Sequence, residues 1–241
     1  ISLCSLFGYP VEQEGIVQAE RQLEDRVQAL GAQQLETWTV EVTYKLKQKK
    51  KRAAITEMRH GVNISAPFVG MKMEDSAEYP FSKQQYCIRR SDDGSRVMVV
   101  QEMAEGSKGA TSLTEGKLIH VLEGQEGVNG IAGASAGLVT KLKARIEGNV
   151  YKLGDFMVRT GKVRKGAVYR GLAMEVEYLP SCRVADGLAM INGLILSVDE
   201  DGLFRPSSDL SGDSETFGTT QQFSPKHTAL QTTDLFNKVF A

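Results

Sequence analysis

The sequence predicts an α+β fold: a predominantly antiparallel β-sheet or barrel of about eight strands, with amphipathic helices packed beside it. Three observations lead to this fold class. Apolar and polar residues alternate strictly over residues 36–46, and two strand-like runs over residues 155–179 are separated by a glycine turn. Helical patterns are fewer than strand patterns and do not alternate regularly with them, which disfavours a doubly wound parallel sheet.

The strands are predicted by period-two alternation. Between Glu36 and Leu46, apolar side chains alternate with Thr, Glu and Lys, a pattern typical of a strand with one wet face. Residues 155–163 and 167–179 are joined through Lys165-Gly166, which indicates an antiparallel hairpin. Shorter strands are expected at residues 2–7, 85–90, 96–102 and 117–122, with Asp92-Asp93-Gly94 as a turn.

The helices are predicted by apolar residues at helical spacing. Residues 13–30 form an amphipathic pattern that ends at Gly31, a typical left-handed cap. Residues 134–147 carry leucine and isoleucine four positions apart and are expected to be helical. A third helix is expected after Asp186, with residues 188–198 on a broad apolar face. The stretch 235–240 is apolar and periodic.

The pattern along residues 1–241 is that of a single domain. Residues 47–75, 104–115 and 199–233 are rich in Gly, Ser, Thr, Asp or Lys and lack periodicity, so we expect mobile loops there. The chain contains no internal repeat.

Composition excludes several classes of protein. The 241 residues carry 29 Lys and Arg against 30 Asp and Glu, a net charge of -1, so no global positive field would attract nucleic acid. No apolar run approaches the roughly 20 residues that cross a bilayer, and no secretory signal begins the sequence. Cys4, Cys87 and Cys182 are far apart without a Cys-x-x-Cys pair. They are expected to be reduced, small hydrophobic residues rather than disulfides, zinc ligands or nucleophiles.

Two strings in the glycine-rich region invite a catalytic or ligand-binding interpretation. Gly133-Ala134-Ser135-Ala136-Gly137 matches a nucleophile elbow, and Asp199 and His227 follow in the appropriate order. Glycines between residues 124 and 137 suggest a phosphate cradle, although their spacing fits neither the dinucleotide fingerprint nor a Walker loop. We interpret both as a flexible, small-residue loop. His60 and His120 also lack ligand partners at a suitable spacing, so no catalytic, cofactor or metal residue is assigned.

Two charged features remain. Glu175 and Glu177 face the same way on their strand and could share a divalent cation, but a solvated face is the favoured interpretation. The basic run Lys45–Arg52 leaves a strand end, and could be a nuclear-import signal, an anion-binding patch or simply a solvated strand end.

The strings Tyr151–Val163 and Arg170–Tyr178 resemble the Mediator complex subunit 20 family, also called TRF-proximal protein. The strand–helix–strand pattern up to residue 46, Ser76-Ala77-Glu78-Tyr79-Pro80 and Leu235-Phe236-Asn237-Lys238 are similar to the same family. This resemblance implies a β-barrel with flanking helices, similar to the tunnel fold of metal-dependent RNA triphosphatases. Those enzymes use several Glu-x-Glu motifs, and only Glu175-x-Glu177 is plain here.

The resemblance also implies a nuclear, non-enzymatic transcription coregulator. Such a protein would form a heterodimer with Mediator subunit 18 in the Mediator head module, near subunits 8 and 17. It would contact RNA polymerase II indirectly, without binding nucleic acid, membrane or cofactor. The alternative function is a metal-dependent tunnel-type hydrolase of polyphosphate or RNA 5′-triphosphate. The helix at residues 188–198 and the apolar residues Leu235, Phe236, Val239 and Phe240 are candidates for the partner surface or for the core.

Overall fold

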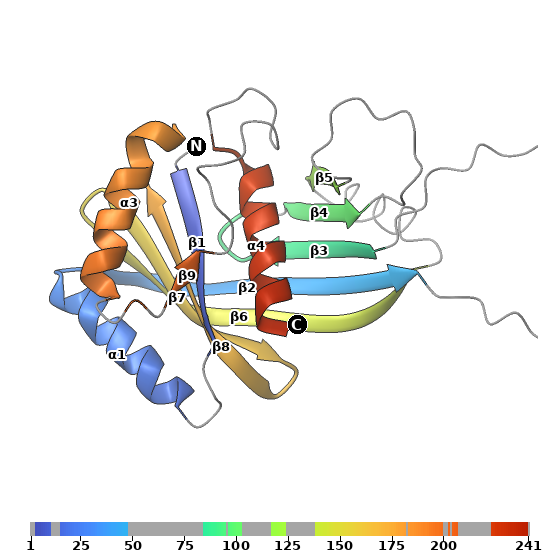
Figure 1. The fold of residues 1–241 in the computed structure, drawn as a ribbon, viewed down its shortest axis with the longest axis horizontal. Helices are drawn as coiled ribbons and strands as arrows, with labels where there is room; N and C mark the ends of the chain where they lie inside the picture. The colour runs from blue at the N-terminus through green and yellow to red at the C-terminus, as the bar shows by residue number, and fades with distance from the viewer. Residues whose placement is uncertain are drawn as a thin grey trace, which may run out of the picture.

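The computed structural model of the chain describes residues 3–10, 15–47, 84–94, 96–102, 117–123, 138–181, 183–199, 202, 204–206 and 223–240. These residues form one curved antiparallel sheet with helices on both of its faces (Figure 1). Within these ranges, no helix is long and apolar enough to cross a membrane.

The sheet has nine strands in the order β5-β4-β3-β2-β6-β7-β8-β1-β9. Their bounds are β1 Leu3–Pro10, β2 Gln33–Lys47, β3 Gln84–Arg90, β4 Val97–Glu102, β5 Lys117–Leu122, β6 Leu138–Leu153, β7 Phe156–Lys165, β8 Val168–Tyr178 and β9 Arg205–Pro206. In the described part of the chain, the edge strands β5 and β9 do not pair with each other. The α+β, antiparallel fold class is therefore confirmed, but the barrel is open rather than closed.

The three helices cover opposite faces of the sheet. Helices α1 (Ile16–Ala29) and α3 (Val184–Val198) pack on one face, where Leu23 and Ile191 join the core over β7 and β8. Helix α4 (Pro225–Phe240) packs on the other face, where Leu235 and Phe236 meet the apolar side chains of β2, β3, β4 and β6. It contacts β1 as well as β4 and β5, so it fills the space between the two ends of the curved sheet (Figure 1).

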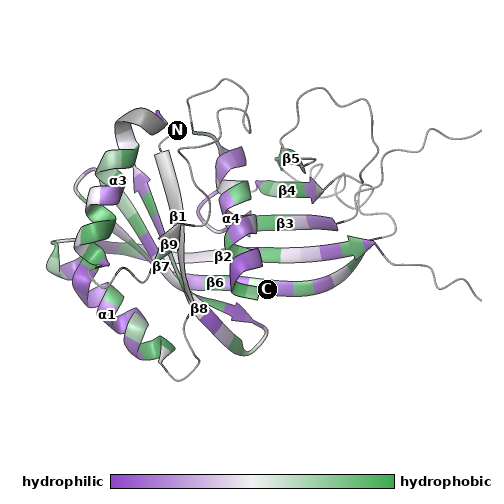
Figure 2. Ribbon diagram, in the orientation of Figure 1, coloured by the Kyte–Doolittle hydropathy of each residue, from purple (hydrophilic) through white to green (hydrophobic). Residues whose placement is uncertain are grey.

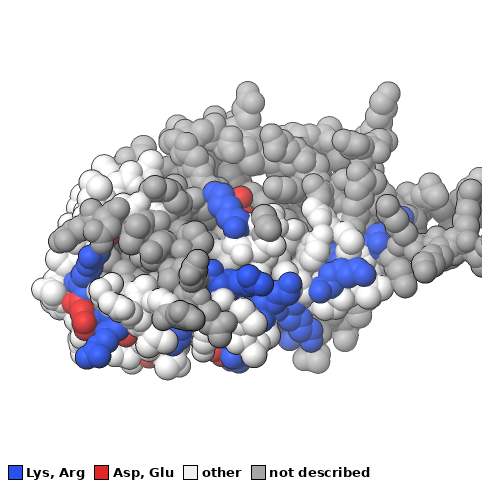
Figure 3. Space-filling model, turned by 60° about the horizontal axis from the view of Figure 1, so that its bottom comes forward, with Lys and Arg blue, Asp and Glu red and all other residues white. Residues whose placement is uncertain are grey.

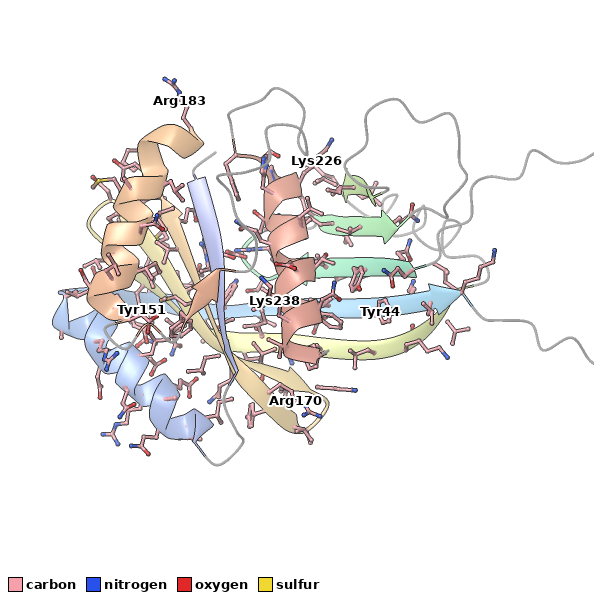
Figure 4. The ribbon with its side chains drawn as sticks, viewed as in Figure 1. Tyr44, Tyr151, Arg170, Arg183, Lys226 and Lys238 are labelled. Carbon is pink, nitrogen blue, oxygen red and sulfur yellow. The ribbon has the colours of Figure 1, made fainter. Side chains whose placement is uncertain are left out.

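Strand β2 follows the predicted alternation closely. Trp38, Val40 and Val42 are at most 3% exposed and point toward α4, whereas Thr37 and Glu41 are exposed. Tyr44 continues the inner face beside α4 (Figure 4), with its ring centroid 4.9 Å from that of Tyr86 and 6.3 Å from that of Phe236. The predicted β7–β8 hairpin is also confirmed, and its turn places Gly166 at a positive φ of 60°.

The predicted helix at residues 134–147 is wrong, because residues 138–153 form strand β6. Leu138, Leu142 and Ile146 recur every four residues, a spacing that fits one face of a helix and one face of a strand equally well. Pairing with β2 and β7 decides between them, since β6 lies in the middle of the sheet. Residues 134–137 lie outside the described residues.

The loop expected at residues 199–233 is shorter than predicted. Residues 205–206 form β9 and residues 225–233 form the first half of α4, while residues 207–222 lie outside the described part. This half of the helix is polar in composition, so apolar periodicity does not predict it. Thr232 and Thr233 can nevertheless be buried, because their hydroxyls donate to the backbone carbonyls four residues earlier. The loops expected at 47–75 and 104–115 lie outside the described residues except for Lys47, which ends β2.

Gly148 and Gly161 lie opposite each other on β6 and β7, where the two backbones approach closely. A Cβ atom at Gly148 would lie 1.8 Å from the carbonyl oxygen of Thr160, and one at Gly161 would lie 2.9 Å from that of Glu147. Backbone atoms cannot move aside as a flexible side chain can, so this crossing requires glycine.

We predict that Gly148→Ala lowers the free energy of unfolding by about 3 kcal/mol or more, because the clash is with backbone. Gly193→Ala is the matched control, since a Cβ there meets nothing within 4 Å on helix α3. It should raise the free energy of unfolding by about 0.5–1 kcal/mol through helix propensity. Urea denaturation of the two variants measures both values, and equal effects would contradict the proposed crossing.

Candidate functional site

Glu175 and Glu177 point into the interior of the curved sheet, not toward solvent. Their side chains are 2% and 22% exposed, so the prediction that they share a face is confirmed and the preferred solvated face is wrong. With Arg90 at the end of β3, Asp92 in the turn after it and Arg159 on β7, they form what we call the charged cluster. The turn predicted at residues 92–94 therefore contributes directly to this site.

Arg90 and Arg159 neutralise the buried carboxylates. Arg90 binds Glu175 with two parallel contacts, Nη1 to Oε2 at 2.6 Å and Nη2 to Oε1 at 2.7 Å. Its remaining donors reach Asp92 at 2.9 and 3.0 Å. Arg159 Nη1 bridges the two glutamates, 2.9 Å from Glu175 and 2.8 Å from Glu177. Bidentate arginine–carboxylate pairs of this kind are among the strongest and most directional ion pairs.

The contact between Arg90 and Glu175 shows that the sheet is strongly curved. Their strands, β3 and β8, are separated by β2, β6 and β7 in the sheet order. In a flat sheet these strands would be about 19 Å apart, at roughly 4.8 Å per step. The side chains nevertheless meet at 2.6 Å, so the charged cluster closes the interior of the open barrel at one end.

The arginines hold the carboxyl groups in their charged form. Burial tends to raise the pKa of Glu175, but the charge and hydrogen bonds of Arg90 outweigh it and keep the pKa below its ordinary value of 4.5. Burial also tends to raise the pKa of Asp92, but hydrogen bonds from Arg90 outweigh this effect and lower the pKa. Glu175 raises the pKa of the buried Arg90 against the opposing effect of burial. Glu175, Asp92 and Arg90 are therefore ionised near neutral pH.

The charged cluster lines a cavity of about 350 Å³ that the first turn of α4 helps to close. Phe223, Ser224, Pro225 and Thr228 contribute from this segment. Within the described residues, no group of three or more His, Cys, Asp or Glu is arranged to hold a metal ion. Both oxygens of Glu175 already accept from arginine, and a divalent cation here would face two buried guanidinium groups.

His227 and Asp199 both contact residues close to them in the sequence, and the Ser224 hydroxyl lies 2.9 Å from His227 Nδ1. The ring Nδ1 of His227 lies 3.0 Å from the Ser224 backbone nitrogen, which donates to it, and the ring stacks on Phe223 at 5.0 Å. Burial lowers the pKa of His227, which favours this neutral, accepting ring. Asp199 Oδ2 accepts from the Phe204 backbone. Residues 124–137, with all the glycines of the predicted phosphate cradle, and His60 lie outside the described residues, as does the side chain of His120.

Cys87 lies half-buried on β3 as a free thiol. Burial raises the pKa of Cys87 more than nearby Lys45 and Arg89 lower it, so the thiol stays protonated and is a poor nucleophile. The other two cysteines have no described side chain. In the predicted basic run, Lys45 and Lys47 end β2, and residues 48–52 lie outside the described part.

Arg90 and Arg159 were missed at the sequence level. The alternation of β7 offers one signal, since Arg159 lies between Met157 and Val163 on a face of the strand that is otherwise apolar. Arg90 gives no comparable signal, because its partner lies 85 residues away.

Comparisons with known proteins address the identity of the chain. A family model described as "TATA-binding related factor (TRF) of subunit 20 of Mediator complex" matches residues 7–237. The Arabidopsis thaliana protein "Mediator of RNA polymerase II transcription subunit 20b" is 33% identical over 99 residues, which cover 37% of this chain and 44% of that relative. The match therefore spans less than half of the relative's length.

The solved structures share less sequence identity with this chain than the Arabidopsis relative does. A Pyrococcus horikoshii OT3 protein superimposes with a TM-score of 0.43 at 11% identity, covering 84% of this chain and 94% of that one. A chain of the Schizosaccharomyces pombe Mediator head module gives a TM-score of 0.37 at 12% identity, covering 85% and 96%.

We predict that Glu175→Gln lowers the free energy of unfolding by about 3–5 kcal/mol, because it leaves buried arginine charge uncompensated. Glu147→Gln is the control: it removes a carboxylate that also bridges two arginines, but with a side chain 33% exposed. Its effect should stay below about 1 kcal/mol. Chemical denaturation at neutral pH compares the two, and a Glu175→Gln effect as small as that of the control would refute the role of the cluster.

The comparison of the wild type with Glu175→Gln also predicts how the free energy of unfolding depends on pH. Because the pKa of Glu175 is lowered on folding, its stabilisation is fully present well above the ordinary value of 4.5 and is lost as the pH falls through the lower folded value. The difference in free energy of unfolding between the wild type and Glu175→Gln should therefore narrow below about pH 4.5. A difference that stays constant down to the acid transition would show that the carboxylate charge is not responsible.

Proposed function

Because the chain belongs to the Mediator subunit 20 family, we propose that it is a non-enzymatic subunit of the Mediator head module and forms a heterodimer with Mediator subunit 18. In this role it would help relay regulatory signals to RNA polymerase II in the nucleus, with subunits 8 and 17 nearby. The family match over residues 7–237 is the observation that carries the proposal. We also propose that residues 1–241 are one domain without catalytic, cofactor or metal residues.

The interior of the sheet supports a non-enzymatic role. Helix α4 covers the apolar part of the inner face, and the charged cluster that lines the adjoining cavity is held together by ion pairs. A tunnel-type phosphohydrolase needs free carboxylate oxygens for its metal and an open path for its substrate. Here the oxygens of Glu175 already bind Arg90 and Arg159.

Helix α3 supports the protein–protein role. Ile191 and Ile195 pack into the core, whereas Met190 and Leu196 on the opposite side are 49% and 74% exposed. Figure 2 shows α3 as the more hydrophobic of the two helices on its side of the sheet. We propose this face of α3 as part of the subunit 18 interface, because a stable heterodimer buries apolar surface that a free subunit exposes.

The terminal residues are less suited to this role. Leu235 and Phe236 are buried, and Phe240 packs against Phe236 with ring centroids 4.8 Å apart. These residues pack against the inner face of the chain's own curved sheet, so truncation after Thr233 would damage the core. Substitution on α3 is the cleaner test of assembly.

We predict that Met190→Ser combined with Leu196→Ser weakens the heterodimer with Mediator subunit 18 at least tenfold, about 1.4 kcal/mol, through lost apolar burial. Val17→Ser is the matched control, since Val17 on α1 is 63% exposed. Light scattering on a sizing column gives the stoichiometry, and titration calorimetry gives the affinity. If the wild type forms no heterodimer with Mediator subunit 18, the pairing is refuted. If the double variant binds subunit 18 as tightly as the wild type does, only the α3 interface is refuted.

The alternative function, a metal-dependent hydrolase of polyphosphate or RNA 5′-triphosphate, keeps one observation in its favour: Glu175 and Glu177 share an inward face with arginines beside a cavity. We expect no phosphate release from triphosphate-ended RNA with Mg²⁺ or Mn²⁺. Hydrolysis by the wild type that Glu177→Gln abolishes, with the variant still folded, would establish the enzyme instead.

A further inference from the structure

The outer face of the sheet carries a second concentration of charge, independent of the charged cluster. A row of side chains crosses four strands at one register, Arg89 on β3, Glu41 on β2, Arg145 on β6 and Arg164 on β7. Lys143 and Lys45 lie in the following rows on the same face. We call Lys45, Arg89, Lys143, Arg145 and Arg164 the basic face.

The basic face has an excess of positive charge that the fold does not require. Glu147 pairs with both Arg145, at 2.9 Å, and Arg164, at 3.0 Å, while Glu41 is 3.8 Å from Arg145. In the described part of the chain, Arg89 and Lys143 have no acidic partner and are exposed. Figure 3 shows Lys and Arg outnumbering acidic side chains on the side that carries β6 and the β7–β8 hairpin.

Arg145 and Arg164 lie directly opposite each other on neighbouring strands. Glu147 bridges the two guanidinium groups and offsets their repulsion. The excess positive charge of the basic face therefore comes mainly from Arg89 and Lys143.

The basic face surrounds a hollow of about 560 Å³. Its floor includes the buried Val97 and the half-buried Cys87, whose protonated thiol is uncharged. Among the described residues that line the hollow, none is aromatic. A ligand here would meet cations around its rim and an apolar surface at its centre.

We propose that the basic face is a docking site for an extended, acidic protein segment that carries an apolar side chain between its carboxylates. Successive same-face residues on β6, such as Lys143 and Arg145, are about 6.7 Å apart. Alternate side chains of an extended peptide have the same repeat, so its carboxylates would meet this series of cations. The apolar floor would receive the intervening side chain.

The observations favour a protein segment over nucleic acid. Single-stranded nucleic acid is held by aromatic side chains that stack on bases, and the described lining of the hollow contains no such side chain. The chain's net charge of -1 supplies no long-range attraction for a polyanion. A phosphate backbone also offers nothing to the apolar floor, which an aliphatic side chain would cover.

The test uses a fluorescent peptide of about ten residues in which Glu alternates with Ser around a central Leu, a length that spans the rows of the face. We expect fluorescence anisotropy to show binding that weakens as salt rises. Arg89→Glu combined with Lys143→Glu should weaken binding by about tenfold or more, because both cations are reversed at exposed positions.

Arg21→Glu combined with Lys226→Glu is the control, with the same change in net charge at exposed positions on α1 and α4. It should bind the peptide within about twofold of the wild type. Equal loss in both variants, or no binding by the wild type, would overturn the proposal. Tighter binding of single-stranded or duplex DNA of equal charge would assign the face to nucleic acid instead. Thermal melting confirms that each variant is folded.

Discussion

The buried contacts among Arg90, Glu175 and Arg159 are the constraint on which the rest of the structure depends. They join β3 to β7 and β8 through the interior, although two strands separate β3 from β7 in the sheet. A weakly curved sheet could not form them. The curvature that brings these side chains together also creates the concave inner face that α4 occupies and the convex outer face that exposes the basic residues. The inner and outer features of the molecule thus have one geometric origin.

Buried ion pairs of this kind give little net stability compared with an apolar substitute of the same volume. Desolvating the charges costs about as much as their attraction returns, so an apolar substitute could be as stable. A shift of β8 by one residue, however, would move Glu175 to the face covered by α1 and α3, where Met174 and Val176 now lie, and leave Arg90 without its partner. The cluster therefore fixes the register of the sheet. It also engages in ion pairs the carboxylates that a phosphohydrolase would need for catalysis. The fold alone therefore does not indicate an enzyme.

Local patterns predicted most of the elements, and non-local contacts account for the remainder. The strands at β2, β7 and β8 follow alternation that the sequence displays directly. The sequence predicts a helix at β6 because an apolar residue at every fourth position satisfies both the helical and the strand period. The sequence predicts a loop at the first half of α4 because its buried threonines are polar, and their hydroxyls satisfy their hydrogen bonds on backbone carbonyls within the helix. At the charged cluster, the shared face of Glu175 and Glu177 was predictable, but Arg90 was not, since no local pattern encodes a partner so distant in sequence.

The position of α4 has a consequence for biosynthesis. It occupies residues 225–240, after every strand of the sheet, yet it covers the apolar side chains of β2, β3 and β4. During translation those strands emerge first and have no cover for their inner face until the helix follows. Such exposed apolar surface attracts chaperones and favours aggregation. The partly made chain therefore exposes this apolar surface until α4 has been synthesised and packs against the inner face of the sheet.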